Sequence, residues 1–182
     1  RCTRRASHGR GSSLTLAKRA VAVVTLQTEI DAPRERVFDL ARSIDAHQDT
    51  AAATGEKAVA GVTSGLLGPG EEVTWEARHF GVVQRLRVKM TRFDRPVHFQ
   101  DVMLAGAFRS MKHDHSFQET DGRTTMFDRF EFAAPLGVLG RCAEWLFLTR
   151  YMRRFLVERN AVLKRTAESS DWRKYLFDGT KG

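Results

Sequence analysis

The sequence contains few of the residues that build disulfide frameworks, zinc clusters or membrane spans. Its two cysteines, Cys2 and Cys142, are too few for a disulfide framework and too far apart for a paired-cysteine zinc motif. The most apolar region, residues 132–148, contains Arg141 and Glu144, so it is too short and too charged to span a bilayer. We therefore predict a reduced, cytoplasmic protein without a transmembrane helix.

Several catalytic and nucleic-acid signatures are also missing. The chain has no glycine-rich phosphate loop and no Gly-x-Ser-x-Gly nucleophile motif. Aromatic residues do not alternate with basic ones along a strand face, which argues against specific nucleic-acid recognition. Small-molecule binding, acid–base catalysis and protein interaction are the classes that stay open.

The net charge of +8 is concentrated near the first residues of the chain. Six basic residues precede the first acidic one, and without them the net charge is +2. We interpret residues 1–20 as a disordered basic arm or an overextended start, with a targeting segment or an arm that contacts an acidic partner as alternatives. Because 42% of the residues are hydrophobic, we expect residues 21–176 to form one domain and residues 177–182 to form a tail.

Local patterns predict a strand followed by two short helices. Residues 21–30 alternate weakly between apolar and polar side chains, which is typical of a strand. Asp31 and Pro33 then indicate a helix start, with the Asp31 carboxylate as the cap. A second short helix is expected over residues 46–53, and a glycine-rich loop over residues 55–70. The expected apolar stripe of the first helix is Val37, Phe38, Ala41 and Ile44.

The middle of the chain predicts several strands joined by tight turns. Residues 72–79 and 82–90 alternate, with a turn near Gly81, and a further strand covers residues 98–104. The face of this last strand that points inward stays open. It is either Phe99, Asp101 and Met103, or His98, Gln100, Val102 and Leu104. Tight turns without intervening helices favour an antiparallel sheet.

Residues 110–132 predict a hairpin with polar groups on its apolar face. Successive strand side chains point to opposite faces, so residues two apart share a face. Asp121-Gly122 supplies the turn. The first strand places Met111, His113, His115 and Phe117 on one face, and the second strand places Met126, Asp128, Phe130 and Phe132 on one face. We expect these faces to coincide, which would bring Asp128 close to both histidines.

A long helix is predicted after Pro135-Leu136-Gly137, ending near residue 166. Its apolar stripe is Leu139, Cys142, Leu146, Thr149, Met152, Leu156 and Leu163, and its opposite surface carries Arg141, Arg150, Arg153, Arg154, Arg159, Lys164 and Arg165. The expected fold class is α+β, a curved antiparallel sheet wrapped around the long C-terminal helix. A cavity between the two layers would suit an apolar ligand.

The chain resembles the SRPBCC superfamily, also called START-like or Bet v 1-like, whose fold is known as a helix grip. The resemblance covers residues 25–176, and the later motifs look closer to a bacterial branch of uncharacterised proteins, some labelled cell-division inhibitors, than to plant allergens or characterised cyclases. The residues that carry it are Ala32-Pro33 with Val37-Phe38, the run from Val73 to Phe80, Phe108-Arg109 with His113-Asp114-His115 and Phe117, and Asp128 with Pro135-Leu136-Gly137.

This resemblance implies a hydrophobic pocket under the C-terminal helix. The superfamily uses that pocket for lipids, sterols, polyketides and hormones, and some branches catalyse cyclisation or dehydration. It shares no single catalytic set, so no catalytic residue is carried over to this chain.

The candidate site combines the polar face of the hairpin with the expected pocket wall. Catalytic candidates are His113, His115 and Asp128. The structural alternative is that the histidines are hydrogen-bonded at the edge of the core and that Asp128 pairs with Arg109 or another cation. The predicted ligand-binding residues are Trp75, His79, Leu86, Val88, Met90, Phe99, Met103, Arg109, Met111, His113, His115, Met126, Asp128, Phe130, Leu146, Thr149 and Met152.

No metal or other cofactor is predicted. His113 and His115 could form a metal triad with His79 or Asp128, but nothing in the sequence identifies the third ligand.

Three functions remain open. The first is the binding of a hydrophobic small molecule that is lipid-, polyketide- or isoprenoid-like. The second is a cyclase- or dehydratase-type enzyme with a His/Asp acid–base pair. The third is a regulatory interaction module, in which the basic helix face contacts an anionic membrane or an acidic protein.

Overall fold

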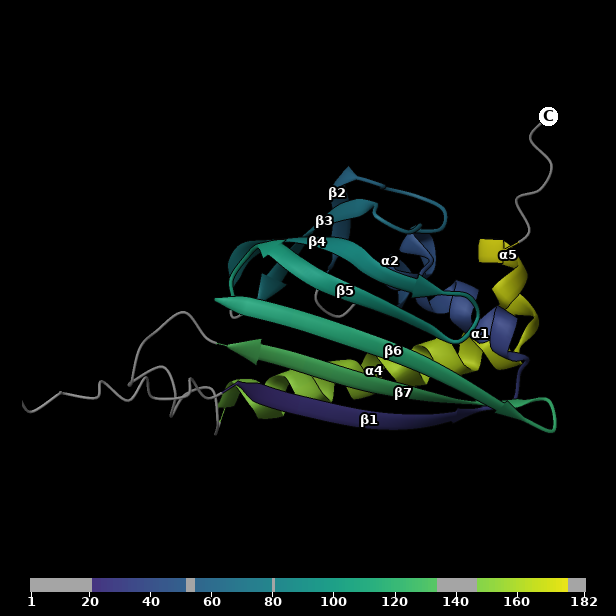
Figure 1. Ribbon diagram of the computed structural model, residues 1–182. Coiled ribbons are helices and arrows are strands. Elements are labelled where there is room, and N and C mark those ends of the chain that lie inside the picture. Colours follow the sequence, from purple (N-terminus) through teal and green to yellow (C-terminus); the bar gives the residue numbers. More distant parts are fainter. Residues whose placement is uncertain (1–20, 52–54, 80, 134–146, 177–182) are drawn as a thin grey trace, which may run out of the picture.

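A seven-stranded antiparallel sheet curves around one long helix in the computed structural model (Figure 1). The structure describes residues 21–51, 55–79, 81–133 and 147–176. The sheet order is β1-β7-β6-β5-β4-β3-β2. The strands are β1 (Ala22–Ile30), β2 (Lys57–Gly61), β3 (Glu72–His79), β4 (Val82–Asp94), β5 (His98–Ala105), β6 (Ser110–Thr120) and β7 (Arg123–Ala133). This arrangement confirms the predicted α+β helix-grip fold.

The β6–β7 hairpin has the predicted register. Asp121 and Gly122 both adopt positive φ angles, of 53° and 74°. Two successive positive φ angles suit a two-residue turn whose twist matches the flanking strands. His115 pairs with Asp128 and His113 pairs with Phe130 across the hairpin, so the two apolar faces coincide.

Two short helices follow β1, as predicted, but their boundaries differ. They are α1 (Arg34–Ala41) and α2 (Ile44–Thr50). The Asp31 carboxylate does not cap α1, because Pro33 occupies the N-cap position and no side chain makes the capping hydrogen bond. Ile44 belongs to α2, since the Ser43 hydroxyl accepts a hydrogen bond from the Ala46 N–H and starts a new helix there.

The long C-terminal helix α4 (Thr149–Glu168) packs its apolar face toward the sheet and contacts β1, α1 and α2. The predicted start of this helix, residues 135–146, lies outside the described residues. A short 3-10 turn, η3 (Ser170–Trp172), and α5 (Arg173–Leu176) follow it. Figure 1 shows α4 running behind β1 and β7, with α1 toward the hairpin turn of β6 and β7 and α2 nearer to β2. The buried positions of α4 are Met152, Leu156, Asn160, Leu163 and Ala167.

Aromatic side chains join the short helices to the sheet. Phe38 of α1 makes edge-to-face contacts with Phe93, Phe99 and Phe117, with ring centroids 5.3–5.5 Å apart. This cluster holds α1 against β4, β5 and β6. Among the described residues, no helix is long and apolar enough to cross a membrane.

Candidate functional site

A cavity of about 310 Å³ lies between the inner face of the sheet and α4. Its apolar wall includes Trp75 from β3, Leu86 and Met90 from β4, and Met152 and Phe155 from α4. The volume is at the lower end of the range for small-molecule sites, and such sites are largely apolar with a few polar groups.

Many of the predicted ligand-binding residues line this cavity. They are Trp75, His79, Leu86, Val88, Met90, Phe99, Met111, His113, Phe130 and Met152. Met103, Met126, His115, Asp128 and Thr149 do not line it, and Leu146 lies outside the described residues. Arg109 is exposed, lies just before β6 and does not line the cavity.

Several polar residues of the cavity were not among the predicted ones. His47, Glu56, Asp101, Tyr151 and Arg159 all line it. The structure also identifies the inward face of β5, because Phe99 and Asp101 reach the cavity. The spacing contained a signal for Arg159. It is three residues after Leu156 and four before Leu163, so it continues the buried stripe of α4.

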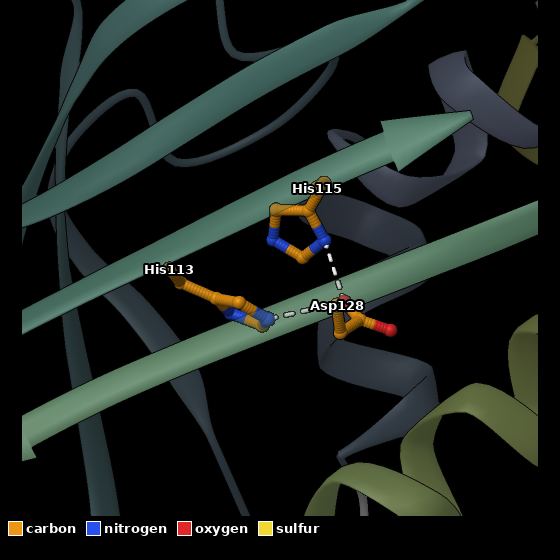
Figure 2. Close-up of side chains that lie close together, drawn as sticks. All are labelled: His113, His115 and Asp128. Atoms are coloured by element: carbon orange, nitrogen blue, oxygen red, sulfur yellow. Dashed lines mark hydrogen bonds and ion pairs between the residues drawn. The ribbon is translucent and has the colours of Figure 1, made fainter. Parts of the chain in front are cut away.

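His113, His115 and Asp128 form a buried cluster, which we call the His–Asp cluster, and its His113 lines the cavity (Figure 2). The Nε2 atom of His113 lies 3.0 Å from Oδ1 of Asp128, and Nδ1 of His115 lies 2.8 Å from the same oxygen. The first contact is a hydrogen bond. The second is as short, but its angles do not make a hydrogen bond, and neither ring nitrogen of His115 has another hydrogen-bond partner in the described part of the chain. These three side chains form a possible metal-binding group.

Helix α4 supplies the partner of the other carboxylate oxygen. The amide Nδ2 of Asn160 donates to Oδ2 of Asp128 at 2.6 Å and lies 3.2 Å from the hydroxyl of Thr28. The Asp128 side chain is 1% exposed, and contacts from β6 and α4 hold its orientation. The predicted alternative of a pair with Arg109 is therefore wrong.

Burial and hydrogen bonding act in opposite directions on Asp128. Burial alone would raise its pKa, but the hydrogen bond from His113 and the contact with His115 outweigh it and hold the pKa well below the ordinary value. For His115, burial lowers the pKa to about 3, and a charge on His113 adds to this effect. His115 is stacked against Phe99 at 4.3 Å and packed against His113 at 3.8 Å between ring centroids, which explains its desolvation.

Asp101 is a second carboxylate beside this cluster. It lies opposite His113 in the β5–β6 register, and its Oδ2 is 3.9 Å from Nε2 of His115. Its Oδ1 is buried and has no hydrogen-bond partner among the described residues. Burial raises the pKa of Asp101 to about 6, although the charges of His113 and Arg159 oppose the rise.

The opposite wall carries a His–carboxylate pair. Nε2 of His47 lies 2.7 Å from Oε2 of Glu56, and the imidazole stacks on Trp75 with ring centroids 4.0 Å apart. Burial and the charge of Arg159 lower the pKa of His47, although the hydrogen bond to Glu56 opposes this. Burial would raise the pKa of Glu56, but the contact with His47 outweighs it and the pKa is lowered.

His79 and Tyr151 link β3 to α4 across the cavity wall. Nδ1 of His79 lies 2.7 Å from the Tyr151 hydroxyl, and the imidazole also meets the edge of Phe155. Burial raises the pKa of Tyr151, and the nearby charge of Glu56 raises it further. At neutral pH this hydroxyl is therefore a neutral hydrogen-bonding group.

Arg159 places a positive charge on the cavity wall. Its Nη2 makes a long hydrogen bond of 3.4 Å to the carbonyl oxygen of Ala41. Within the described ranges it forms no ion pair with an acidic side chain, although the other charged groups of the cavity lie close enough to be influenced by it. The prediction that Arg159 belongs to the outer basic face of the helix is wrong, whereas Arg150, Arg153, Arg154 and Arg165 are exposed.

Comparisons with known proteins agree with this architecture. Residues 21–168 match the family described as polyketide cyclase / dehydrase and lipid transport. Comparison with curated proteins finds no significant match.

Solved structures with the same fold come from several organisms. The protein TTHA0849 from Thermus thermophilus is 16% identical, with a TM-score of 0.67 over 80% of this chain and 97% of that one. A START superfamily protein from Mycobacterium smegmatis is 12% identical, with a TM-score of 0.61 over 80% and 97%. The Zhui aromatase/cyclase from Streptomyces sp. R1128 is 16% identical, with a TM-score of 0.56 over 88% and 100%. At these identities the likeness shows the fold alone.

The chain belongs to the polyketide cyclase / dehydrase and lipid transport family, because the match covers most of its length.

Proposed function

We propose that this protein binds a hydrophobic small molecule whose apolar body fills the cavity and whose polar end carries a negative charge or a carbonyl group. The observation that carries the proposal is the guanidinium of Arg159, which lines the cavity without an acidic partner in the described part of the chain. A charge kept in an apolar cavity is costly unless it is paired, so it favours a ligand that supplies the counter-charge.

Other polar groups support the same arrangement. Asp101 and His113 line the cavity from neighbouring strands, and each can exchange a hydrogen bond with a ligand hydroxyl or carbonyl. The apolar wall around them consists of aliphatic, methionine and aromatic side chains, which adapt to a flexible ligand body. Lipids, polyketides and isoprenoids with a polar end all fit this description.

Native mass spectrometry of the purified chain, followed by extraction under denaturing conditions, tests whether a ligand accompanies the protein. We expect a stoichiometric adduct that extracts as an apolar molecule with an acidic or carbonyl group. Recovery of a strongly polar or nucleotide-like adduct would contradict the proposal.

Defined probes test the role of Arg159 directly. We expect dodecanoic acid to bind more tightly than dodecan-1-ol, because only the acid carries a charge that pairs with the guanidinium. Arg159→Gln should lower the affinity for the acid about tenfold or more and leave the affinity for the alcohol nearly unchanged. The matched control is Arg165→Gln, since Arg165 is exposed on the same helix. Equal affinities of the acid and the alcohol for the unaltered protein would count against a charged polar end.

A second candidate function is acid–base catalysis on the bound molecule. His113 lines the cavity, and its Nε2 is held by a carboxylate that Asn160 fixes from behind. An imidazole oriented by a buried carboxylate is a common arrangement for a general base. Turnover of an added polyketide or β-hydroxyacyl substrate by the unaltered protein, lost in His113→Asn, would establish this function.

A further inference from the structure

Not every buried polar atom of the His–Asp cluster has a hydrogen-bond partner among the described residues. His115 is 2% exposed, yet neither of its ring nitrogens has a hydrogen-bond partner in the described ranges. A buried polar group without a partner costs roughly 1–3 kcal/mol. Such groups in a folded protein indicate a water molecule or an ion that satisfies them.

The contact between His115 and Asp128 has the geometry of two groups that share a third. Nδ1 and Oδ1 are 2.8 Å apart, but the N–H direction does not point at the oxygen well enough for a hydrogen bond. Two ligand atoms that each bind a metal ion at about 2.1 Å lie roughly 3.0 Å apart at the 90° angle of an octahedral site and roughly 3.4 Å apart at the tetrahedral angle of zinc. Their lone pairs then converge on the ion and not on each other. His113 Nε2 lies 3.0 Å from the same oxygen in a hydrogen bond, so binding of an ion would replace this bond and release its proton.

We propose that His113, His115 and Asp128 bind a divalent transition-metal ion beside the cavity. The three ligand atoms lie within 4.8 Å of one another. Two imidazoles and one carboxylate are a donor set used by zinc sites with an open position and by non-haem iron(II) sites. The structure thereby answers the question that the sequence left open, since it brings Asp128 to the two histidines as the third ligand, whereas His79 is hydrogen-bonded to Tyr151.

The surroundings resemble the outer contacts of a metal centre. Metal-binding carboxylates are themselves hydrogen-bonded, and Asn160 donates to Oδ2 of Asp128, which leaves Oδ1 for the ion. Metal-binding histidines turn their second nitrogen toward a carboxylate or carbonyl group, and Nε2 of His115 faces Asp101 at 3.9 Å. His113 lines the cavity, so an ion held here would be reached from the cavity.

Calorimetric titration of the chelator-treated full chain with Zn²⁺ alone, and with Fe²⁺ under anaerobic conditions, tests the site. We expect one ion per chain, a higher thermal unfolding temperature, and no response to Mg²⁺ at the same concentration. X-ray absorption of the zinc-loaded protein should show nitrogen and oxygen ligands at about 2.0–2.1 Å and no sulfur. Absence of saturable binding of either metal to the folded, unaltered chain would overturn the proposal.

Variants then locate the ion. Asp128→Asn and His115→Asn should abolish binding, and Asn160→Ala should weaken it about 10- to 100-fold because it removes an outer contact of the carboxylate. His79→Asn should bind normally. A Cys2→Ser, His8→Asn double variant should also bind normally, since these are the potential ligands among the first twenty residues. Binding that persists in a folded His115→Asn protein, or that disappears in the double variant, would place the ion elsewhere and refute the site.

The metal site is independent of the proposed ligand. The affinity for dodecanoic acid is measured on the metal-free protein. The ligand-binding proposal and the metal-site proposal can therefore be refuted separately.

Discussion

Asn160 of α4 donates a 2.6 Å hydrogen bond to Oδ2 of Asp128 in β7, which joins the long helix to the centre of the sheet through a buried carboxylate. Both residues are nearly inaccessible to solvent, with Asn160 4% and Asp128 2% exposed. A polar residue in the apolar stripe of a helix therefore selects the rotation and position of α4 on the sheet. The same bond holds the carboxylate in the orientation in which it meets His113 and His115.

Removing the Asn160 amide should destabilise the fold. In Asn160→Ala, Oδ2 of Asp128 loses its donor while it stays buried, and an unsatisfied buried acceptor costs roughly 1–3 kcal/mol. Urea unfolding followed by circular dichroism measures the loss. The control is Val157→Ala, because Val157 is exposed on the same helix and its change should stay within about 0.5 kcal/mol. A variant as stable as the parent would show that the bond does not support the packing of α4.

The His47–Glu56 pair should make the protein less stable in acid. The pKa of Glu56 is lowered on folding, so its contribution is present above the ordinary value of 4.5 and is lost as the pH falls through the folded value. The pKa of His47 is also lowered from 6.5, so protonation of the unfolded chain below that pH favours unfolding too. Both effects have the same sign.

Glu56→Gln isolates the carboxylate part of this effect. At pH 7.5 the variant should be less stable than the parent by about 1 kcal/mol, because a hydrogen bond to a charged group is lost. The difference should shrink at pH 4, where the parent begins to lose the same contribution. Urea unfolding at the two pH values measures it, with exposed Glu35→Gln as the control. A difference that stays constant between pH 7.5 and pH 4 would show that Glu56 does not titrate differently in the folded state.

Filling the cavity should prevent ligand binding while leaving the fold intact. Ala77 of β3 lines the cavity, so the ring of Ala77→Phe would occupy ligand space. We expect the affinity for dodecanoic acid to fall at least about tenfold. Arg78→Phe adds the same ring on the neighbouring, exposed side of the strand and should bind normally. Undiminished binding to Ala77→Phe would mean that the acid binds outside this cavity.

The β6–β7 turn should depend on Gly122 through backbone conformation alone. Its φ angle is 74°, and a Cβ atom built at this position meets no atom within 4 Å. Gly122→Ala should therefore cost about 1–2 kcal/mol, since L-residues other than asparagine and aspartate rarely adopt this conformation. Gly122→Asn should cost less because asparagine tolerates it. Thermal unfolding of the two variants compares them, and an Ala variant as stable as the Asn variant would contradict this reason.

The fold and part of the site could be predicted because they depend on short-range periodicity. The period of two in residues 110–132, with Asp121-Gly122 between the strands, was enough to bring His113, His115 and Asp128 onto one face. The turns without intervening helices were enough to predict an antiparallel sheet. In each case the pattern lies within about twenty residues, so neighbouring side chains carry the information.

Contacts between distant segments decided the rest. Arg159 has the spacing of the buried stripe of α4 but the charge of its outer face, and packing against β1, α1 and α2 placed it on the cavity wall. The alternation of β5 allowed two inward faces, and pairing with β4 and β6 selected the one with Asp101. Local periodicity shows which face of a helix or strand is the more apolar, but the segment that covers that face comes from elsewhere in the chain. For this reason the roles of His47, Glu56, Asp101, Tyr151 and Arg159 in the cavity, and of Asn160 behind Asp128, became visible only in the folded structure.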